Sequence, residues 1–205
     1  MKGEKRKQLI LDCAKKLFAK QGFYRTQISD IVREINIARG TVYQYFANKE
    51  EIFICLLEDA YSKWEKAIYD AVELINLKTI TPVEYFRLRI KTTLDFLLAD
   101  PDICEIVMSM GFGLPEGLEK ATRKLEEKIR DIALNDFKLG LHNGYIRESI
   151  NTLHAAEMIA AAVLRSAYYF QNNKKEEKQI DKITDEIVNL FAPGIFTADV
   201  LAALS

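Results

Sequence analysis

The chain of 205 residues is 49% hydrophobic, which is enough for a packed core in one large domain or in a small domain followed by a larger one. It has no apolar run of the ~18 residues that a membrane span needs and no apolar stretch after its Lys-rich amino terminus, so we expect a cytoplasmic protein without a transmembrane helix or signal peptide. The net charge of −1 is divided unevenly, since residues 1–50 hold 11 Lys and Arg against 5 Asp and Glu, which favours a negatively charged partner over a random scatter of charge.

The first predicted helix follows a basic amino-terminal arm. Residues 1–7 contain three lysines and one arginine, and we expect this arm to fray in the free protein. Apolar residues then recur at helical spacing from Leu9 to Phe18. This spacing predicts an amphipathic helix that ends at Gly22.

Residues 26–49 predict two short helices joined by a tight turn. Isoleucine and valine at helical spacing over residues 28–35 give the first helix one apolar face, and Thr26 is a hydroxyl cap at its start. Asn36 follows, and asparagine tolerates the positive φ that a sharp reversal needs. The second helix is expected over residues 38–46.

The second of these helices has a chemically unusual outer face. Steps of about 100° per residue put Val42 and Phe46 on its inner side and leave glycine, hydroxyl, amide and phenol groups outside. Guanidinium and amide groups suit base edges, and hydroxyls suit phosphate oxygens. A solvated face on a small helical bundle is the alternative interpretation. The outward residues are Gly40, Thr41, Gln44 and Tyr45, with Arg39 and Tyr43 on the flanks.

The string Gly-Thr-Val-Tyr-Gln-Tyr-Phe at residues 40–46, followed by Asn-Lys-Glu-Glu at residues 48–51, resembles the helix-turn-helix signature of the TetR family of bacterial transcription regulators. The resemblance covers roughly residues 7–57. Two positions depart from the family pattern, because Asn36 stands where glycine is usual and Ala38 where serine is usual, which removes a helix cap. Upstream, the resemblance includes Ala14, Leu17, Phe18, Gly22, Phe23, Thr26 and Ile31.

This resemblance implies an all-α protein of about nine helices, with a three-helix helix-turn-helix DNA-binding domain at residues 1–47. A long helix would join it to a larger helical-bundle domain at residues 48–205 that binds ligand and dimerises. The resemblance further implies a homodimeric repressor that binds double-stranded, palindromic operator DNA and is released by a small, largely apolar effector. The implied DNA-binding residues are Thr26, Arg39, Gly40, Thr41, Tyr43, Gln44, Tyr45 and Lys49. Among them, Arg39 and Gln44 would read bases, and the others would mainly position the DNA backbone.

The joining helix is predicted to begin at Asn48, which forms a capping box with Glu51. Its apolar face continues to Trp64, and the helix is expected to reach about Ile75. Such a helix spans roughly 40 Å, so we interpret it as a lever that can carry a displacement from the larger domain to the DNA-binding one.

Caps and helix breakers delimit the remaining elements. Thr81-Pro82 and Asp100-Pro101 each pair a capping residue with a proline suited to the first helical turn. Gly140 is expected to interrupt a long charged helix just before a turn at residues 142–147. No stretch has the alternation of a β-strand. Helices are expected over residues 82–98, from residue 101 to the glycines at 111 and 113, and over residues 116–141, 152–170 and 180–191.

The last two predicted helices are candidates for a subunit interface. Alanines allow close helix approach in the first, and the three-four spacing of isoleucines suits a helix seam in the second. These residues could equally close the core of one subunit, but the resemblance implies a four-helix interface with a second copy. The candidate interface residues are Ala156, Ala160, Val163, Ile180, Ile183, Ile187 and Leu190.

Aromatic and thioether side chains in the middle of the chain are mostly expected in the core. The resemblance implies that some surround a small-molecule pocket, and such side chains suit an apolar ligand. Arg165 is a permanent charge within an apolar helix, for which an ion pair is the favoured explanation and an anionic ligand group the alternative. The candidate ligand-binding residues are Trp64, Phe86, Phe96, Met108, Phe112, Arg165, Tyr168 and Tyr169.

Catalysis and metal binding find no support in the sequence. It has no Gly-rich phosphate loop and no nucleophile elbow, and its two histidines are too sparse for a metal site, so we expect no enzyme activity, cofactor or metal. Cys13, Cys55 and Cys104 lie far apart among apolar helix positions and are expected to be free thiols. The alternative function is a helical ligand-binding or scaffolding protein that does not bind an operator.

Overall fold

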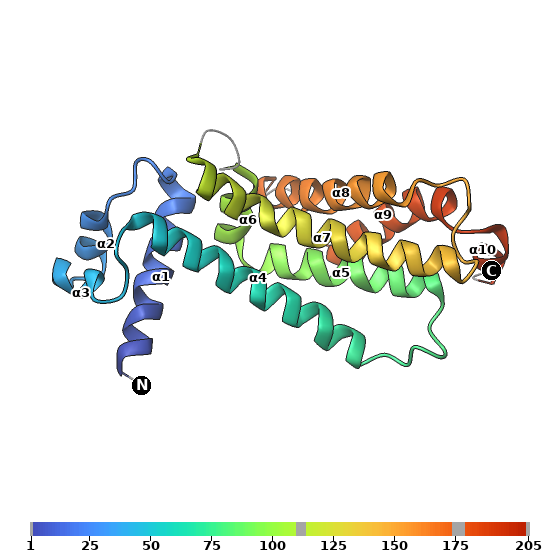
Figure 1. Cartoon of the computed structure of the whole chain (residues 1–205), viewed down its shortest axis with the longest axis horizontal. Coiled ribbons are helices and arrows are strands. Elements are labelled where there is room, and N and C mark those ends of the chain that lie inside the picture. The colour runs from blue at the N-terminus through green and yellow to red at the C-terminus, as the bar shows by residue number, and fades with distance from the viewer. Residues whose placement is uncertain (1, 110–113, 174–178, 204–205) are drawn as a thin grey trace. The chain divides into compact units, whose positions relative to one another are not determined.

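The computed structural model describes residues 2–109, 114–173 and 179–203, and these ranges form ten helices without a β-strand (Figure 1). The only paired extended residues among them form an isolated antiparallel bridge between Ile146 and Phe196. The predicted all-α class is confirmed. The helices are α1 (Lys2–Gln21), α2 (Ile28–Glu34), α3 (Arg39–Tyr43), α4 (Lys49–Glu73), α5 (Pro82–Ala99), α6 (Pro101–Ser109), α7 (Glu116–His142), α8 (Thr152–Asn172), α9 (Ile180–Ile195) and α10 (Ala198–Ala202).

The chain divides into two compact units. The first contains residues 1–63 and 100–124, and the second contains residues 64–99 and 125–205. Helices α4 and α7 each continue without a break from one unit into the other. The functional boundary after residue 47 remains a prediction, because the division by packing follows different limits.

An aromatic cluster forms the core of the first unit. The rings of Phe18 on α1 and Phe53 on α4 meet edge to face at 5.3 Å, and Phe23 contacts both at 5.7 and 5.2 Å. All three side chains are buried, so the cluster fixes the amino-terminal helices against the start of α4. An ion pair of 2.6 Å between Lys15 and Asp100 holds α1 beside the start of α6.

Local capping sets three of the helix starts at their predicted places. The carboxamide oxygen of Asn48 accepts from the amide of Glu51 at 2.7 Å at the start of α4. The hydroxyl of Thr81 accepts from the amide of Glu84 at 3.2 Å before α5, and Asp100 caps α6 through the amide of Ile103 at 3.2 Å. Each bond satisfies an amide that lacks a partner within its own helix.

Three features differ from the sequence-based expectations. The basic arm is helical, because α1 already begins at Lys2. Gly140 does not interrupt α7, which continues to His142; an added Cβ at Gly140 would lie 2.8 Å from Cδ1 of Ile146, so the glycine lets the following turn pack onto the helix. Helix α9 also extends past Pro193 to Ile195 and is followed by the short α10.

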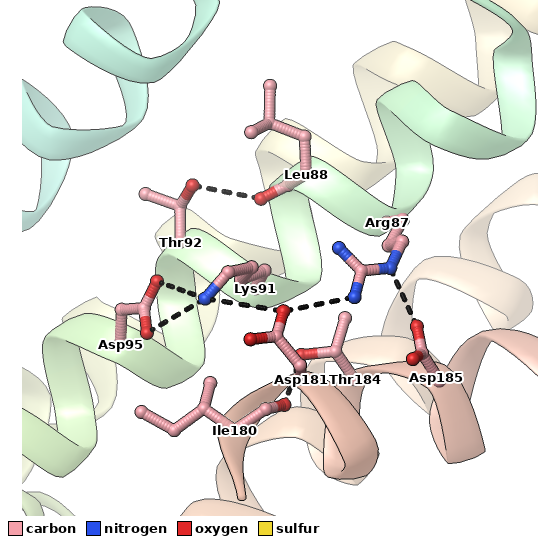
Figure 2. Close-up of polar contacts among 9 residues, drawn as sticks. All are labelled: Arg87, Leu88, Lys91, Thr92, Asp95, Ile180, Asp181, Thr184 and Asp185. Atoms are coloured by element: carbon pink, nitrogen blue, oxygen red, sulfur yellow. Dashed lines mark hydrogen bonds and ion pairs between the residues drawn. The ribbon is translucent and has the colours of Figure 1, made fainter.

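Helices α5, α8 and α9 pack together as the centre of the second unit (Figure 1). Figure 2 shows the polar edge between α5 and α9, where Arg87 pairs with Asp185 at 2.6 Å and with Asp181 at 3.0 Å. Lys91 joins the same cluster through Asp95 and Asp181 at 3.2 and 3.6 Å. These contacts orient α9 along α5, and the hydrogen bonds from Arg87 lower the pKa of Asp181.

Candidate DNA-binding surface and effector cavity

Helices α2 and α3 form the predicted helix-turn-helix. Asn36, between them, has a φ of 50°, which confirms that this position adopts the left-handed conformation. The start of α2 differs from the prediction by one residue, because Gln27 rather than Thr26 precedes the helix. The amide of Gln27 donates to the carboxylate of Asp30 at 2.9 Å and thereby closes the first turn.

The inner and outer sides of α3 are as its helical spacing predicts. Val42 is fully buried and Phe46, just beyond the helix, is 1% exposed, so both hold α3 against the first unit. Arg39, Gly40 and the carboxamide-bearing Gln44 are exposed. The remaining predicted contact residues on this side are Thr41 and Tyr45, which are half-buried, and Tyr43, which is exposed.

Arg39 and Tyr43 form a pair on the outer side of α3. A guanidinium nitrogen of Arg39 lies 3.3 Å from the hydroxyl oxygen of Tyr43, and its central carbon lies 5.7 Å from the ring centre. This contact orients the guanidinium along the helix surface without burying it. A Cβ added at Gly40 would meet nothing within 4 Å, so the surface between these side chains is open to an approaching partner.

The amino terminus of α1 borders this surface. A Cβ added at Gly3 would lie 3.6 Å from the hydroxyl of Tyr45, and the ammonium of Lys7 lies 5.5 Å from the ring centre of Phe46. The helical arm therefore brings positive charge beside α3, where it can act on a phosphate backbone together with Arg39.

Thr26 and Lys49 are directed into the protein, which differs from the phosphate contacts predicted for them. Thr26 is 0% exposed, and its hydroxyl lies within hydrogen-bonding distance of the carbonyl oxygens of Gly22 at 2.8 Å and Leu17 at 3.3 Å. Lys49 donates to the carbonyl oxygens of Phe23 and Thr26, and burial lowers its pKa. Both side chains hold the loop before α2 in this structure.

A cavity of about 410 Å³ lies within the second unit. Its size falls within the range of small-molecule sites, and most of its wall is aliphatic or aromatic. Trp64 and Phe86, two of the predicted ligand-binding residues, line it. The wall comes from α4, α5, α7 and α8, from the loop before α5, from the turn after α7 and from Phe196. Its residues include Ile68, Val72, Leu77, Ile90, Ile129, Ala133, Phe137, Asn143, Tyr145, Ile146, Ile159 and Val163.

One part of the cavity wall is polar. Arg89 on α5 donates from Nε to Oδ2 of Asp136 on α7 at 3.0 Å and from Nη2 to Oδ1 at 3.4 Å. The hydroxyl of Tyr85 donates to the same Oδ1 at 3.3 Å, and its ring lies 4.9 Å from the guanidinium. Burial raises the pKa of the Asp136 carboxyl even though Arg89 opposes this, and burial also raises the pKa of Tyr85.

The other predicted ligand-binding residues lie elsewhere. Arg165 is exposed on α8 and contacts the ring of Tyr168 at 5.4 Å, and it does not line the cavity, so it forms no anion site there. The favoured ion pair, within α8 or with a second subunit, stays a prediction. Phe112 lies outside the described residues. The residues that do not line the cavity are Phe96, Met108, Arg165, Tyr168 and Tyr169.

The sequence analysis missed Arg89 and Asp136, although the helical spacing of their neighbours could have identified both as cavity residues. Arg89 follows Phe86 by three residues and precedes Thr93 by four, and all three line the cavity from one side of α5. Asp136 occupies the equivalent place on α7, between Ala133 and Gly140. A lone charge on an otherwise uncharged helical stripe marks a polar group that faces an interior.

Most of the predicted interface residues are buried within the single chain. Ala156, Ala160, Val163, Ile183 and Ile187 are at most 7% exposed, because they pack α8 and α9 into the core of the second unit. This corrects their assignment to a surface seam. Leu190 is 76% exposed, and Ile180 is half-buried. The outward positions of α8 carry Met158, which is 61% exposed, and Tyr169.

No helix within the described ranges is long and apolar enough to cross a membrane.

Residues 10–55 match the model of a family described as bacterial regulatory proteins, tetR family. The fatty acid metabolism regulator protein of Bacillus subtilis (strain 168) is 23% identical over 193 residues, which cover 91% of this chain and 93% of that protein.

Two solved structures share the fold over almost the whole chain. The structure of the transcriptional regulator FadR from Bacillus subtilis in complex with stearoyl-CoA has a TM-score of 0.75 at 22% identity, and covers 89% of this chain and 96% of its own. The structure of AibR in complex with isovaleryl coenzyme A and operator DNA has a TM-score of 0.74 at 17% identity, and covers 92% of this chain and 98% of its own.

Proposed function

The chain belongs to the tetR family of bacterial regulatory proteins through its residues 10–55, and from this premise we propose that it is a cytoplasmic repressor that binds a palindromic operator as a homodimer and leaves it when a small, largely apolar ligand binds. The proposed DNA binding is supported mainly by the open outer side of α3, where Arg39, Gly40 and Gln44 are exposed while Val42 is buried on the inner side. A short helix held in this way offers side chains to the major groove, where guanidinium and carboxamide groups distinguish bases.

In this proposal Arg39 and Gln44 read base edges, while Thr41, Tyr43 and Tyr45 bind the sugar-phosphate backbone. Gly40 lets the backbone approach, and the basic start of α1 adds sequence-independent attraction. Thr26 and Lys49 contribute indirectly, by fixing the loop that leads into α2.

The effector site in this proposal is the cavity lined by Trp64 and Phe86. Its mostly apolar wall and the pair of Arg89 and Asp136 suit an apolar chain with one polar group. FadR from Bacillus subtilis and AibR were solved with CoA thioesters of a long and a short acyl chain, and the acyl chain with its thioester carbonyl has that pattern. Helix α4 contributes Trp64, Ile68 and Val72 to the cavity wall and begins directly after the helix-turn-helix, so it is the proposed route from effector to DNA.

A two-fold dimer would present two α3 helices to two half-sites, which is why a palindromic operator is expected. The outward sides of α8 and α9, with Met158, Tyr169 and Leu190, are the proposed contact between the copies. Catalysis has no part in the proposed function.

The test begins with footprinting of the purified protein on genomic DNA, which should reveal a short inverted repeat. Acyl-CoA thioesters of graded chain length are then added to the protein bound at that site. Release of the operator by one range of chain lengths is the expected result. Ligand binding without any operator binding would instead support a helical ligand-binding or scaffolding protein.

A further inference from the structure

The guanidinium of Arg89 has donors to spare inside the cavity. An arginine side chain carries five N–H donors, and Asp136 accepts from only two of its nitrogens, Nε and Nη2. These two bonds leave the Nη1 nitrogen of Arg89 unused by Asp136. Because Arg89 lines a cavity that is otherwise mostly apolar, these N–H groups can be satisfied by an oxygen atom of a bound molecule.

The same corner already contains the counter-charge of Arg89. The carboxylate of Asp136 neutralises the guanidinium, and the other titratable side chains of the cavity wall are the phenols of Tyr85 and Tyr145. A ligand carboxylate would therefore share one guanidinium with Asp136. Two neighbouring carboxylates do not both remain ionised at low cost, so one of them would have to take up a proton.

We propose that the cavity selects an uncharged carbonyl group on an apolar chain, as in an ester or thioester, over the free carboxylate of the same chain. Arg89 donates to the carbonyl oxygen, Asp136 is its fixed counter-ion, and Tyr85 orients the pair. This inference rests on the proposed function in taking the cavity as the effector site, and it adds the chemical class of the group that the effector presents there.

The single tryptophan of the chain provides the readout. Trp64 lines the cavity, is 1% exposed and donates from Nε1 to the hydroxyl of Thr93 at 3.3 Å, so its emission reports on a molecule that enters. Methyl octanoate, octanoyl-CoA and octanoate are titrated against the full-length protein between pH 6 and pH 8. The ester and the thioester should bind with an affinity that does not depend on pH. Octanoate should bind at least about tenfold more weakly at pH 8 and recover as the pH falls, because its complex takes up a proton.

Two variants test whether Arg89 and Asp136 cause the preference for the uncharged carbonyl group. Asp136→Asn keeps the shape but removes the counter-ion, so octanoate should gain roughly tenfold to a hundredfold in affinity and lose its pH dependence, while methyl octanoate changes little. Arg89→Gln should weaken the binding of methyl octanoate and of octanoyl-CoA by about tenfold or more, because their carbonyl oxygen loses its donor. The matched control is Arg87→Gln on the same helix, whose carboxylate partners Asp181 and Asp185 do not line the cavity and whose loss should leave every affinity unchanged.

The result that overturns the inference is equal affinity of the unmodified protein for octanoate and methyl octanoate across this pH range. The inference would also be overturned if the Asp136→Asn protein folds, binds operator and still prefers methyl octanoate to octanoate as strongly as the unmodified protein does. If that variant does not fold, the pH dependence of octanoate binding to the unmodified protein decides. Release of the operator by all three compounds alike would refute this inference and leave the proposed function intact, whereas unchanged Trp64 emission and operator binding with all three would refute the cavity as the effector site.

Discussion

The ammonium nitrogen of Lys49 lies 2.9 Å from the main-chain oxygen of Thr26, and a second hydrogen bond of 2.8 Å joins it to the oxygen of Phe23. The same ammonium lies 4.0 Å from the centre of the Phe23 ring. One residue of the first turn of α4 thus holds the loop before α2. Its charge is used within the protein, so we propose that Lys49 supports the position of α2 and does not contact DNA.

The first prediction is that Lys49→Met lowers the free energy of unfolding by about 1 to 2 kcal/mol, because two carbonyl groups lose their charged donor. Urea denaturation followed by circular dichroism measures this change. Operator affinity should fall, since the loop before α2 is loosened, but the slope of log K against log salt should stay the same. Lys63→Met is the control, because the ion pair of Lys63 with Asp59 is exposed and lies within one helix.

The opposite pattern would identify Lys49 as a phosphate contact. In that case Lys49→Met would leave the urea midpoint unchanged and would reduce the salt slope by about 1.

The second prediction concerns the exposed residues of α3 and the turn after it. Gln44→Ala should cost about 1 to 3 kcal/mol on the preferred operator and relax the preference at one base position, because a carboxamide pairs with one kind of base edge. Tyr45→Phe should weaken all sequences alike, since its hydroxyl would bind only the DNA backbone. Binding to a pool of randomised operators, sequenced after selection, measures both effects. An unchanged base preference with Gln44→Ala would remove this residue from the base-reading set.

The parts of the fold that could be predicted from the sequence are those set by nearby residues. Asn36 reverses the chain through its own φ, and Asn48 caps α4 through a residue three positions later, so each leaves a local pattern. The cavity has no such pattern, because Arg89 and Asp136 are 47 residues apart and meet only after α5 and α7 pack. Burial of Thr26 likewise depends on where the carbonyl groups of α1 lie.

The same reasoning explains the misassigned interface. A three-four spacing of isoleucines shows that α9 has an apolar side, but it does not show whether that side faces its own chain or a second copy. Ile183 and Ile187 face their own chain, and only Leu190 of that series is strongly exposed. Sequence spacing alone therefore predicted a buried stripe and left its partner open, and the resemblance to the family assigned it to a second copy.

The third prediction follows from these positions. The double variant Met158→Glu and Leu190→Glu should sediment as a folded monomer and lose operator binding, because it places charge on both outward helix sides proposed for the dimer. Ile183→Lys is the informative comparison. Its side chain is 4% exposed, so the ammonium would be buried in the core of the second unit, and loss of the helical circular dichroism signal is expected. Dimers of the double variant at micromolar concentration would show that the copies meet elsewhere.

The fourth prediction is that effector and operator weaken each other by the same factor. A ligand shifts an equilibrium only through its different affinities for two states, so a tenfold to hundredfold loss of operator affinity requires about 1.4 to 2.8 kcal/mol of coupling. Trp64 makes the reciprocal quantity measurable, since it lines the cavity and belongs to α4, which begins just after the helix-turn-helix. Octanoyl-CoA is titrated by Trp64 emission with and without a saturating operator, and operator binding is titrated with and without the thioester. The factor by which operator weakens thioester binding should equal the factor by which the thioester weakens operator binding, because both belong to one thermodynamic cycle. Equal thioester affinity with and without operator would mean that occupation of the cavity is not coupled to DNA binding, and that α4 does not transmit the change.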